Sequence, residues 1–385
     1  MRRATVFTLL AFLPATLAAQ GRSERAGFIS RLGNDTLAVE QFTRTSTRLE
    51  ADLAARVPRT RRIHFVATLN PDQTVARVQV NVQPSVPAPD TPAFTADMVF
   101  GKDSAIVTLK LPDSTQTVRM AIEPGAMPLS STSYAMYEQI FLRFRRVGRD
   151  SLPFQVVPLG APKPTATSVV RRGPDSADFD YFGLPLHAKL DKQGRLLALD
   201  GRASTNKVLV DRVASADVDK AFRDFAARDA AGQPLGLLSP RDTVRATIGS
   251  AHVVVDYGRP HKRGREIFGT VVPWNQVWRT GANAATGFTT DADLKVGDTT
   301  IPKGSYTIWT LPSQSAAKLI VNSQTGQWGT EYDSTKDLAR VDMTAGALPQ
   351  LMETFTIGID PQGDHGGVLR LQWDRTQYSL PFTVQ

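Results

Sequence analysis

The chain has 385 residues but no cysteine and only five histidines. Without cysteine it can form no disulfide bond, no thiolate metal site and no cysteine nucleophile. The histidines, at positions 64, 187, 252, 261 and 365, do not occur at the spacing of a known metal-binding motif. The sequence therefore predicts no metal and no cofactor, and stability must come from packed hydrophobic cores.

Several sequence signatures of enzymes are also missing. There is no phosphate-binding loop, no dinucleotide-binding fingerprint and no Gly-x-Ser-x-Gly nucleophile elbow. The 45 basic residues exceed the 37 acidic residues by eight, which suits attraction to anionic ligands but is too diffuse for nucleic-acid binding. We therefore expect a binding protein more than an enzyme, with no nucleic-acid partner.

The first nineteen residues are typical of a secretory signal peptide. Arg2 and Arg3 precede an apolar run from Ala4 through Leu17, which is followed by the small residues Ala18 and Ala19. The run is too short to span a bilayer as a helix, and no later segment is apolar enough to do so. Because no cysteine is available for lipid attachment, we expect cleavage after Ala18 or Ala19 and export to the periplasm or the extracellular space.

Residues 20–231 are expected to form a β-rich N-terminal domain. Apolar and polar residues alternate over 63–69 and again over 78–82, on either side of a turn at 70–73, which predicts a hairpin with one buried face. Helices are expected at 133–146, where tyrosine and phenylalanine recur at helical spacing, and after Val218. Residues 232–240, rich in glycine and proline, are predicted to be a linker.

Residues 241–385 consist of many short strand-like runs separated by turns such as 296–298 and 302–304. Short strands with regular turns and no long helix favour a β-sandwich or a jelly-roll. The predicted fold class is therefore mainly β. It comprises an N-terminal antiparallel sheet with one or two helices and a C-terminal β-sandwich or jelly-roll-like domain.

The most unusual segment runs from Asp256 to Asn283, where arginine and lysine alternate with glycine, proline and aromatic residues. Arginine presents paired donors that match carboxylate, phosphate or sulfate, and tryptophan offers a stacking face for a ring. The alternative is structural: the arginines pair with acids such as Asp256 and Glu266, and Trp278 fills the core. Under the first interpretation the ligand-binding residues are Tyr257, Arg259, Lys262, Arg265, Trp278, Arg279 and Asn283.

Short motifs in and after this segment carry a family resemblance. They are Tyr257-Gly-Arg-Pro260, Ile267-Phe-Gly269, Val277-Trp-Arg-Thr-Gly-Ala-Asn283, Ile301-Pro-Lys-Gly-Ser-Tyr306 and Trp328-Gly329. Over about residues 238–360 the chain resembles the bacterial domain-of-unknown-function family 2911, which implies no established reaction. Ala284 stands where the family pattern often has an acidic residue. The N-terminal half resembles only loosely the half-barrels of periplasmic lipoprotein carriers.

Three functional hypotheses remain open at this point. The leading one is an exported protein whose C-terminal domain binds an anionic or polar ligand, such as a glycan or an envelope component. The second is a hydrolase or lyase acting on carbohydrate, with Glu266 or His261 as the proton carrier. The third is a carrier of an apolar ligand in the N-terminal sheet. The arginine cluster is a binding site if its arginines line a solvent-open pocket and structural if acids seal them, whereas a concavity filled by side chains would count against the carrier.

Overall fold

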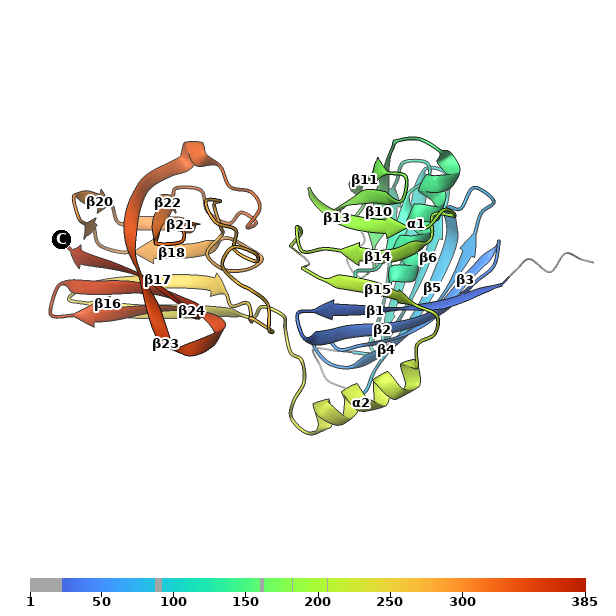
Figure 1. Cartoon of the computed structure of the whole chain (residues 1–385), viewed down its shortest axis with the longest axis horizontal. Coiled ribbons are helices and arrows are strands. Elements are labelled where there is room, and N and C mark those ends of the chain that lie inside the picture. The colour runs from blue at the N-terminus through green and yellow to red at the C-terminus, as the bar shows by residue number, and fades with distance from the viewer. Residues whose placement is uncertain (1–22, 87–91, 160–162, 182, 206) are drawn as a thin grey trace, which may run out of the picture.

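The computed structural model describes residues 23–86, 92–159, 163–181, 183–205 and 207–385. The predicted signal peptide lies outside these ranges. Within them, no helix is both long enough and apolar enough to cross a membrane. The strands form two separate sheets, one in each half of the chain (Figure 1). The predicted mainly β fold class, with its two helices, is confirmed.

The N-terminal sheet contains fifteen strands in the order β8-β7-β6-β5-β4-β3-β2-β1-β15-β14-β13-β12-β11-β10-β9. Neighbours pair antiparallel except β9, which runs parallel to β10. The strands are β1 (Glu24–Leu32), β2 (Asp35–Arg44), β3 (Arg48–Ala55), β4 (Arg61–Leu69), β5 (Val75–Pro84), β6 (Phe94–Phe100), β7 (Ser104–Leu111), β8 (Ser114–Ala121), β9 (Met127–Leu129), β10 (Ser151–Pro158), β11 (Thr165–Gly173), β12 (Ser176–Tyr181), β13 (Leu184–Leu190), β14 (Leu196–Asp200) and β15 (Leu209–Val213).

Strands β4 and β5 form the hairpin that the alternating pattern predicts. Ile63 pairs with Val82 and Phe65 with Val80. The valines of β5 are buried while the residues between them are exposed, so one face of the hairpin belongs to the core. The concave side of the curved sheet faces helix α1 (Tyr134–Val147), as Figure 1 shows.

Helix α1 fills the space inside the N-terminal sheet. Its tyrosine, isoleucine and phenylalanine side chains recur at helical spacing and are at most 2% exposed. The buried carboxylate of Glu40, on β2, accepts hydrogen bonds from Ser133 Oγ (2.6 Å) and from the backbone N–H of Tyr134 (2.7 Å) at the start of the helix. Burial raises the pKa of Glu40 to about 7. The aromatic stripe of α1 is thus part of the core of the N-terminal sheet.

Helix α2 (Val218–Ala230) packs on the outer face of the same sheet, against β2 and β3. Asp217 caps its first turn by accepting from Lys220 N. Val218 and Phe225 are buried against Ala54. Near the end of the helix, the carboxylate of Asp229 accepts from Thr60 N at 2.7 Å. The helix is thus fixed to the sheet at both ends, and the chain leaves it toward the second half of the molecule.

The C-terminal sheet has nine strands in the order β16-β17-β18-β21-β22-β23-β24-β19-β20. The long strands β23 and β24 bend, so that the sheet folds into two layers over one core (Figure 1). Phe355 and Trp373 are almost completely buried in that core. The strands are β16 (Arg241–Ile248), β17 (Ala251–Gly258), β18 (Thr286–Thr290), β19 (Leu294–Val296), β20 (Thr299–Ile301), β21 (Gly304–Pro312), β22 (Ala316–Asn322), β23 (Asp337–Gln362) and β24 (Gly366–Val384).

Candidate functional site between the two sheets

The arginine-rich loop between β17 and β18 contacts the other half of the chain. At the turn between β1 and β2, Asn34 N donates a hydrogen bond to Arg263 O at 2.9 Å. The Arg263 guanidinium forms an ion pair with Asp35. Gly33 has φ +57°, and a Cβ on it would lie 1.9 Å from Arg263 O. The two halves therefore meet at a close backbone contact that only glycine allows.

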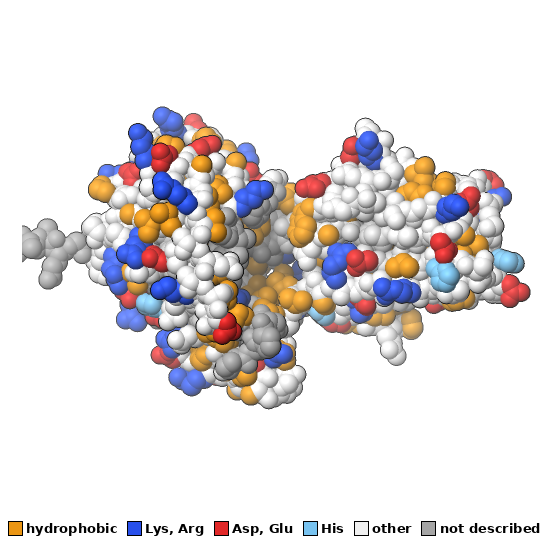
Figure 2. Space-filling model, turned by 180° about the vertical axis from the view of Figure 1, so that it is seen from behind, with side chains coloured by type: hydrophobic (Ala, Val, Ile, Leu, Met, Phe, Trp, Pro, Cys, Tyr) orange, Lys and Arg blue, Asp and Glu red, His pale blue; other side chains and the backbone are white. Residues whose placement is uncertain are grey.

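A cavity of about 520 Å³ lies beside this contact. Strand ends and loops of the N-terminal sheet form one wall, the arginine-rich loop and Trp328 form the opposite wall, and Leu237 and Leu238 of the connecting segment close one side. Figure 2 shows a hollow at the junction of the two halves, with hydrophobic side chains around it. The volume is in the range of sites that hold small molecules.

Three cationic side chains line the cavity: Lys207, Arg265 and Arg279. No aspartate or glutamate is among the described residues that line it. Burial lowers the pKa of Lys207 to about 8, and repulsion from Arg279 and Arg265 adds to this effect. Burial also lowers the pKa of Arg279 and of Arg265. The described lining is therefore cationic and contains no acid, although Glu353 acts on Arg265 from outside the lining and partly offsets the effect of burial on its pKa.

Backbone hydrogen bonds to β21 fix the position of the chain next to Arg279. The neighbouring Trp278 exchanges two backbone hydrogen bonds with Thr310, each 2.8 Å long. Within the described ranges, the Arg279 guanidinium has no carboxylate partner, and its buried Nε has no hydrogen-bond acceptor. A buried, unpaired guanidinium is costly. Among the described residues, this guanidinium therefore remains without a carboxylate partner.

The structure brings together four of the seven predicted ligand-binding residues. Arg265, Trp278, Arg279 and Asn283 all line the cavity. Trp278 stacks on Trp373, with ring centroids 6.0 Å apart and planes 17° apart, so its position is fixed from behind.

The other three predicted residues have structural partners and do not line this cavity. Tyr257 is fully buried in the core, and its hydroxyl accepts from Ile357 N at 3.0 Å. Arg259 forms an ion pair with Asp242 and donates to Thr356 Oγ1, each at 3.0 Å. Lys262 lies 2.9 Å from a carboxylate oxygen of Asp374. Arg259 and Lys262 thus pair with acids of the protein, as the structural alternative in the sequence analysis expects for basic residues of this segment.

Lys207, Trp328 and Tyr181 line the cavity although they were not among the predicted residues. Trp328 belongs to the Trp328-Gly329 motif, whereas Lys207 and Tyr181 stand outside any motif and belong to the other half of the chain. Lys207 has φ +54°, a backbone conformation that is uncommon for a residue with a side chain. That conformation is visible only in three dimensions, so the sequence carries no signal for it.

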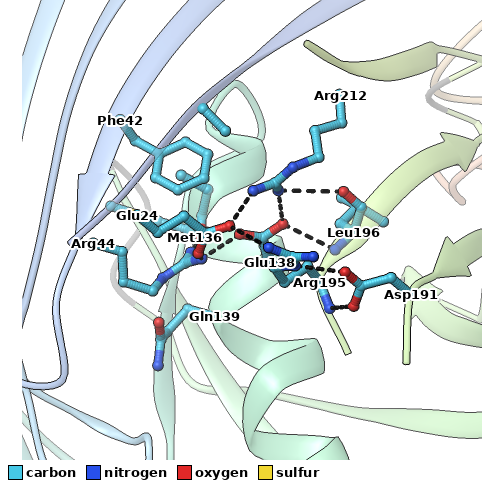
Figure 3. A network of polar contacts seen from close by, with 12 residues as sticks. Glu24, Phe42, Arg44, Met136, Glu138, Gln139, Asp191, Arg195, Leu196 and Arg212 are labelled. Carbon is cyan, nitrogen blue, oxygen red and sulfur yellow. Dashed lines mark hydrogen bonds and ion pairs between the residues drawn. The ribbon is translucent and has the colours of Figure 1, made fainter. Parts of the chain in front are cut away.

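A second group of buried charges, in the N-terminal sheet, is balanced. Glu138 on α1 is fully buried and forms ion pairs with Arg44 and Arg212 (Figure 3). Leu196 N donates to the same carboxylate at 2.9 Å. Glu24 pairs with both arginines as well. Every charge here has a partner of opposite sign, which distinguishes this structural network from the unpaired cations of the cavity.

The two proton carriers of the hydrolase hypothesis lie apart. His261 Nδ1 is 2.8 Å from Thr354 Oγ1, in a pocket with Arg263 and Glu353. Burial lowers the pKa of His261. Glu266 is exposed and lines a different pocket. In the part of the chain that the structure describes, no three histidine, aspartate or glutamate side chains gather as a metal site would require.

A family model matches the half of the chain that contains the arginine-rich loop. Residues 239–382 match the family described as "Protein of unknown function (DUF2911)". The resemblance read from the short motifs is thereby confirmed, and the DUF2911 match extends it to residue 382, within β24. It covers less than half of the chain. Lys207 and Tyr181 lie outside the DUF2911 segment, whereas Arg265 and Arg279 lie within it.

No curated protein matches the chain. Among solved structures, a DUF1089 family protein from Pseudomonas aeruginosa has 12% identity and a TM-score of 0.33, covering 44% of this chain and 92% of that protein. A "beta-barrel-like protein of domain of unknown function DUF1849" from Brucella abortus also has 12% identity and a TM-score of 0.33. That match covers 50% of this chain and 94% of the Brucella protein.

Proposed function

We propose that the protein binds a small anionic ligand in the cavity between its two sheets, and that it is an exported binding protein, not an enzyme. The observation that carries the proposal is Arg279, a largely buried guanidinium with no acid paired to it. An acidic component of the cell envelope is a ligand of this class. The Arg2–Ala19 sequence pattern supports the exported location.

The buried Arg279 guanidinium has no counter-charge among the described residues, so its burial is unfavourable in the free protein. Removing a guanidinium from water costs several kcal/mol unless a partner compensates for the lost hydration. A carboxylate, phosphate or sulfate would supply that partner through charge-assisted hydrogen bonds, which are about twice as strong as neutral ones. Lys207 approaches the same space from the other half of the chain. Binding would thus relieve repulsion among cations that the folded protein already holds close together.

In this proposal the two sheets belong to two domains, 20–231 and 241–385, joined by residues 232–240. The ligand contacts both domains, because Lys207 and Arg279 belong to different ones. The N-terminal sheet supports the site from one side and is not itself a carrier of apolar ligands, since α1 fills its concave side.

The proposal is tested by the effect of sulfate on thermal unfolding, with chloride at equal ionic strength as the reference. We expect sulfate to raise the Tm of the wild type and of Arg119→Gln, a control at an exposed arginine on the edge strand β8. It should not raise the Tm of Arg279→Gln. At a sulfate concentration of about one hundred times Kd, the expected stabilisation is about 2.7 kcal/mol.

The behaviour of Arg279→Gln without sulfate separates a binding arginine from a structural one. Because the substitution removes an unpaired buried charge, we expect the Tm to stay the same or to rise. A structural arginine would behave in the opposite way. A Tm far below that of the wild type, together with an unchanged response to sulfate, would overturn the proposal.

A further inference from the structure

We infer that the natural ligand is an amphiphilic anion: an anionic group joined to a compact ring system. The anionic group lies against Arg279, and the rings cover the apolar side chains at the mouth of the cavity. The inference rests on the proposed function for its anionic end. The apolar end rests on separate observations.

The first observation is that two large apolar side chains at the cavity are left in contact with water. Leu237 is 59% exposed and Trp328 is 47% exposed, and both line the cavity. They come from different parts of the chain, the connecting segment and a loop of the C-terminal sheet. Apolar side chains from separate segments that converge, uncovered, beside a cavity are typical of a binding surface.

The second observation is that the apolar surface and the cation are adjacent. Gly329 follows Trp328 directly and lies against the side chain of Arg279. Gly329 N also donates to Asn283 O at 2.9 Å, which ties the Trp328 loop to the arginine-rich loop. One small molecule can therefore contact the guanidinium and the indole at the same time.

The third observation is the shape of the walls. Trp278 and Tyr181 line the cavity together with Pro273, and these side chains are flat or rigid. Phe355 packs edge-on against Trp278, with centroids 5.0 Å apart, which holds the indole in place. Rigid flat walls favour a rigid flat ligand, since neither partner loses much conformational freedom on binding.

A neutral or acidic sugar fits this lining less well than a ring system with an apolar face. Sugar hydroxyls need acceptors as well as donors, and carboxylates are the strongest acceptors that proteins offer. The described lining contains no aspartate or glutamate. Apart from the polar side chains of Ser204, Thr205, Ser239 and Asn283, the lining combines cations with apolar surface, which suits an amphiphilic anion.

A matched pair of dyes tests the inference directly. The fluorescent probe 8-anilinonaphthalene-1-sulfonate carries a sulfonate on its ring system, whereas N-phenyl-1-naphthylamine has the same rings without the charge. We expect the sulfonate to bind the full-length protein at least about tenfold more tightly than the uncharged dye. In Arg279→Gln this ratio should fall by at least about threefold, because the substitution removes the attraction of Arg279 for the sulfonate while Lys207 and Arg265 remain.

Variants at the mouth of the cavity test the apolar end. Trp328→Ala and Leu237→Ser should each weaken binding of the sulfonated dye by about threefold to thirtyfold, in line with the apolar area removed from the contact. Leu338→Ser and Leu351→Ser are the controls. These leucines are 47% and 49% exposed, similar to the test residues, but they do not line the cavity.

The outcomes separate this inference from the proposed function. If sulfate stabilises the protein through Arg279 but the sulfonated dye binds no more tightly than sulfate, the amphiphilic ligand is wrong and anion binding stands. If dodecanoate binds more than about tenfold more tightly than the dye, the ring system is wrong. If neither sulfate nor the dye depends on Arg279, both proposals fail.

Discussion

The side chain of Arg279 lies directly over Gly329. A Cβ at position 329 would come within 2.1 Å of Arg279 Cδ and within 2.5 Å of Asn283 O, so this contact leaves no room for any side chain. The glycine of the Trp328-Gly329 motif therefore determines where the guanidinium lies.

We expect Gly329→Ala to weaken anion binding by displacing Arg279. The added methyl group must move either the arginine side chain or the Asn283 backbone, and moving either one alters the cavity wall. The loss should be at least about tenfold in affinity for sulfate, measured by calorimetry. Gly346→Ala is the matched control, because a Cβ at Gly346 meets no atom within 4 Å. Equal affinities of the two variants would show that Arg279 does not depend on this contact.

Anion binding should be coupled to proton uptake by Lys207. In the free protein, burial together with Arg279 and Arg265 lowers the pKa of Lys207 from 10.5 to about 8. A bound anion raises this pKa again, because the ammonium group then has a partner. At about pH 9 the free protein holds Lys207 mostly neutral, so binding takes up a proton, whereas at about pH 6 it takes up none.

The affinity should therefore fall as the pH rises above about 8, by up to about tenfold for each further pH unit. Calorimetry in buffers of different ionisation enthalpy measures the number of protons taken up. Lys207→Met should abolish the uptake at about pH 9 while leaving the contribution of Arg279 in place. Uptake that persists in Lys207→Met would assign the proton to another group.

Glu40 should make the stability of the N-terminal sheet depend on pH. Burial raises the pKa of Glu40 from 4.5 to about 7, so folding favours the protonated carboxyl. Its stabilising contribution is present in full below about pH 4.5 and is lost as the pH rises through about 7. Between about pH 5 and pH 8 the expected loss in unfolding free energy is about 2–3 kcal/mol.

Urea unfolding of Glu40→Gln at the same two pH values isolates this effect. The glutamine amide can accept from Tyr134 N and donate to Ser133 Oγ, and it does not titrate. The variant should therefore lose about 2–3 kcal/mol less than the wild type over this interval. The same loss in both proteins would mean that Glu40 ionises normally.

Glu138→Gln should destabilise the protein strongly because it removes the fully buried partner of Arg44 and Arg212 and leaves them only the partly exposed Glu24. Breaking a buried ion pair from one side costs about 3–5 kcal/mol. Asp211→Asn, which breaks the exposed pair with Arg31, should cost at most about 1 kcal/mol. Denaturant unfolding compares the two, and similar values would show that the Glu138 network contributes no more than a surface ion pair.

Gly33→Ala should loosen the contact between the two halves. The new Cβ would overlap with Arg263 O, and the left-handed backbone at position 33 adds strain. Gly148→Ala is the control, because Gly148 has a similar positive φ, at the end of α1, but an open surrounding. We expect Gly33→Ala to lower the Tm further than Gly148→Ala and to increase the radius of gyration in solution scattering. An unchanged radius would show that the halves do not depend on this turn.

Part of the fold could be predicted because the relevant signal is local. The alternation of Val78, Val80 and Val82 with polar residues identifies the buried face of β5 without any knowledge of its partner. The same alternation, through Val253, Val255 and Tyr257, places the tyrosine in the core of β17. That signal was available in the sequence and argues against a ligand-binding role for Tyr257.

The candidate site could be predicted only in part, because contacts between residues far apart in the sequence determine which arginines are paired with acids. Arg259 and Arg279 look alike in the sequence. They differ because the pairing of β16 with β17 brings Asp242 to Arg259, whereas no acid reaches Arg279 within the described residues. Lys207 becomes part of the site because the two halves of the chain meet, and no local pattern encodes that contact.

The division of the cavity between the DUF2911 segment and the rest of the chain bears on how its specificity arose. The segment contributes Arg265, Arg279 and the Trp328 loop, whereas Lys207, Tyr181 and Leu184 are supplied by a sequence that the DUF2911 match does not include. A protein carrying the segment beside a different neighbour would present the same guanidinium to a different opposite wall. Under the proposed function, the ligand would then change when the adjoining part of the gene is exchanged, without any substitution in the segment itself.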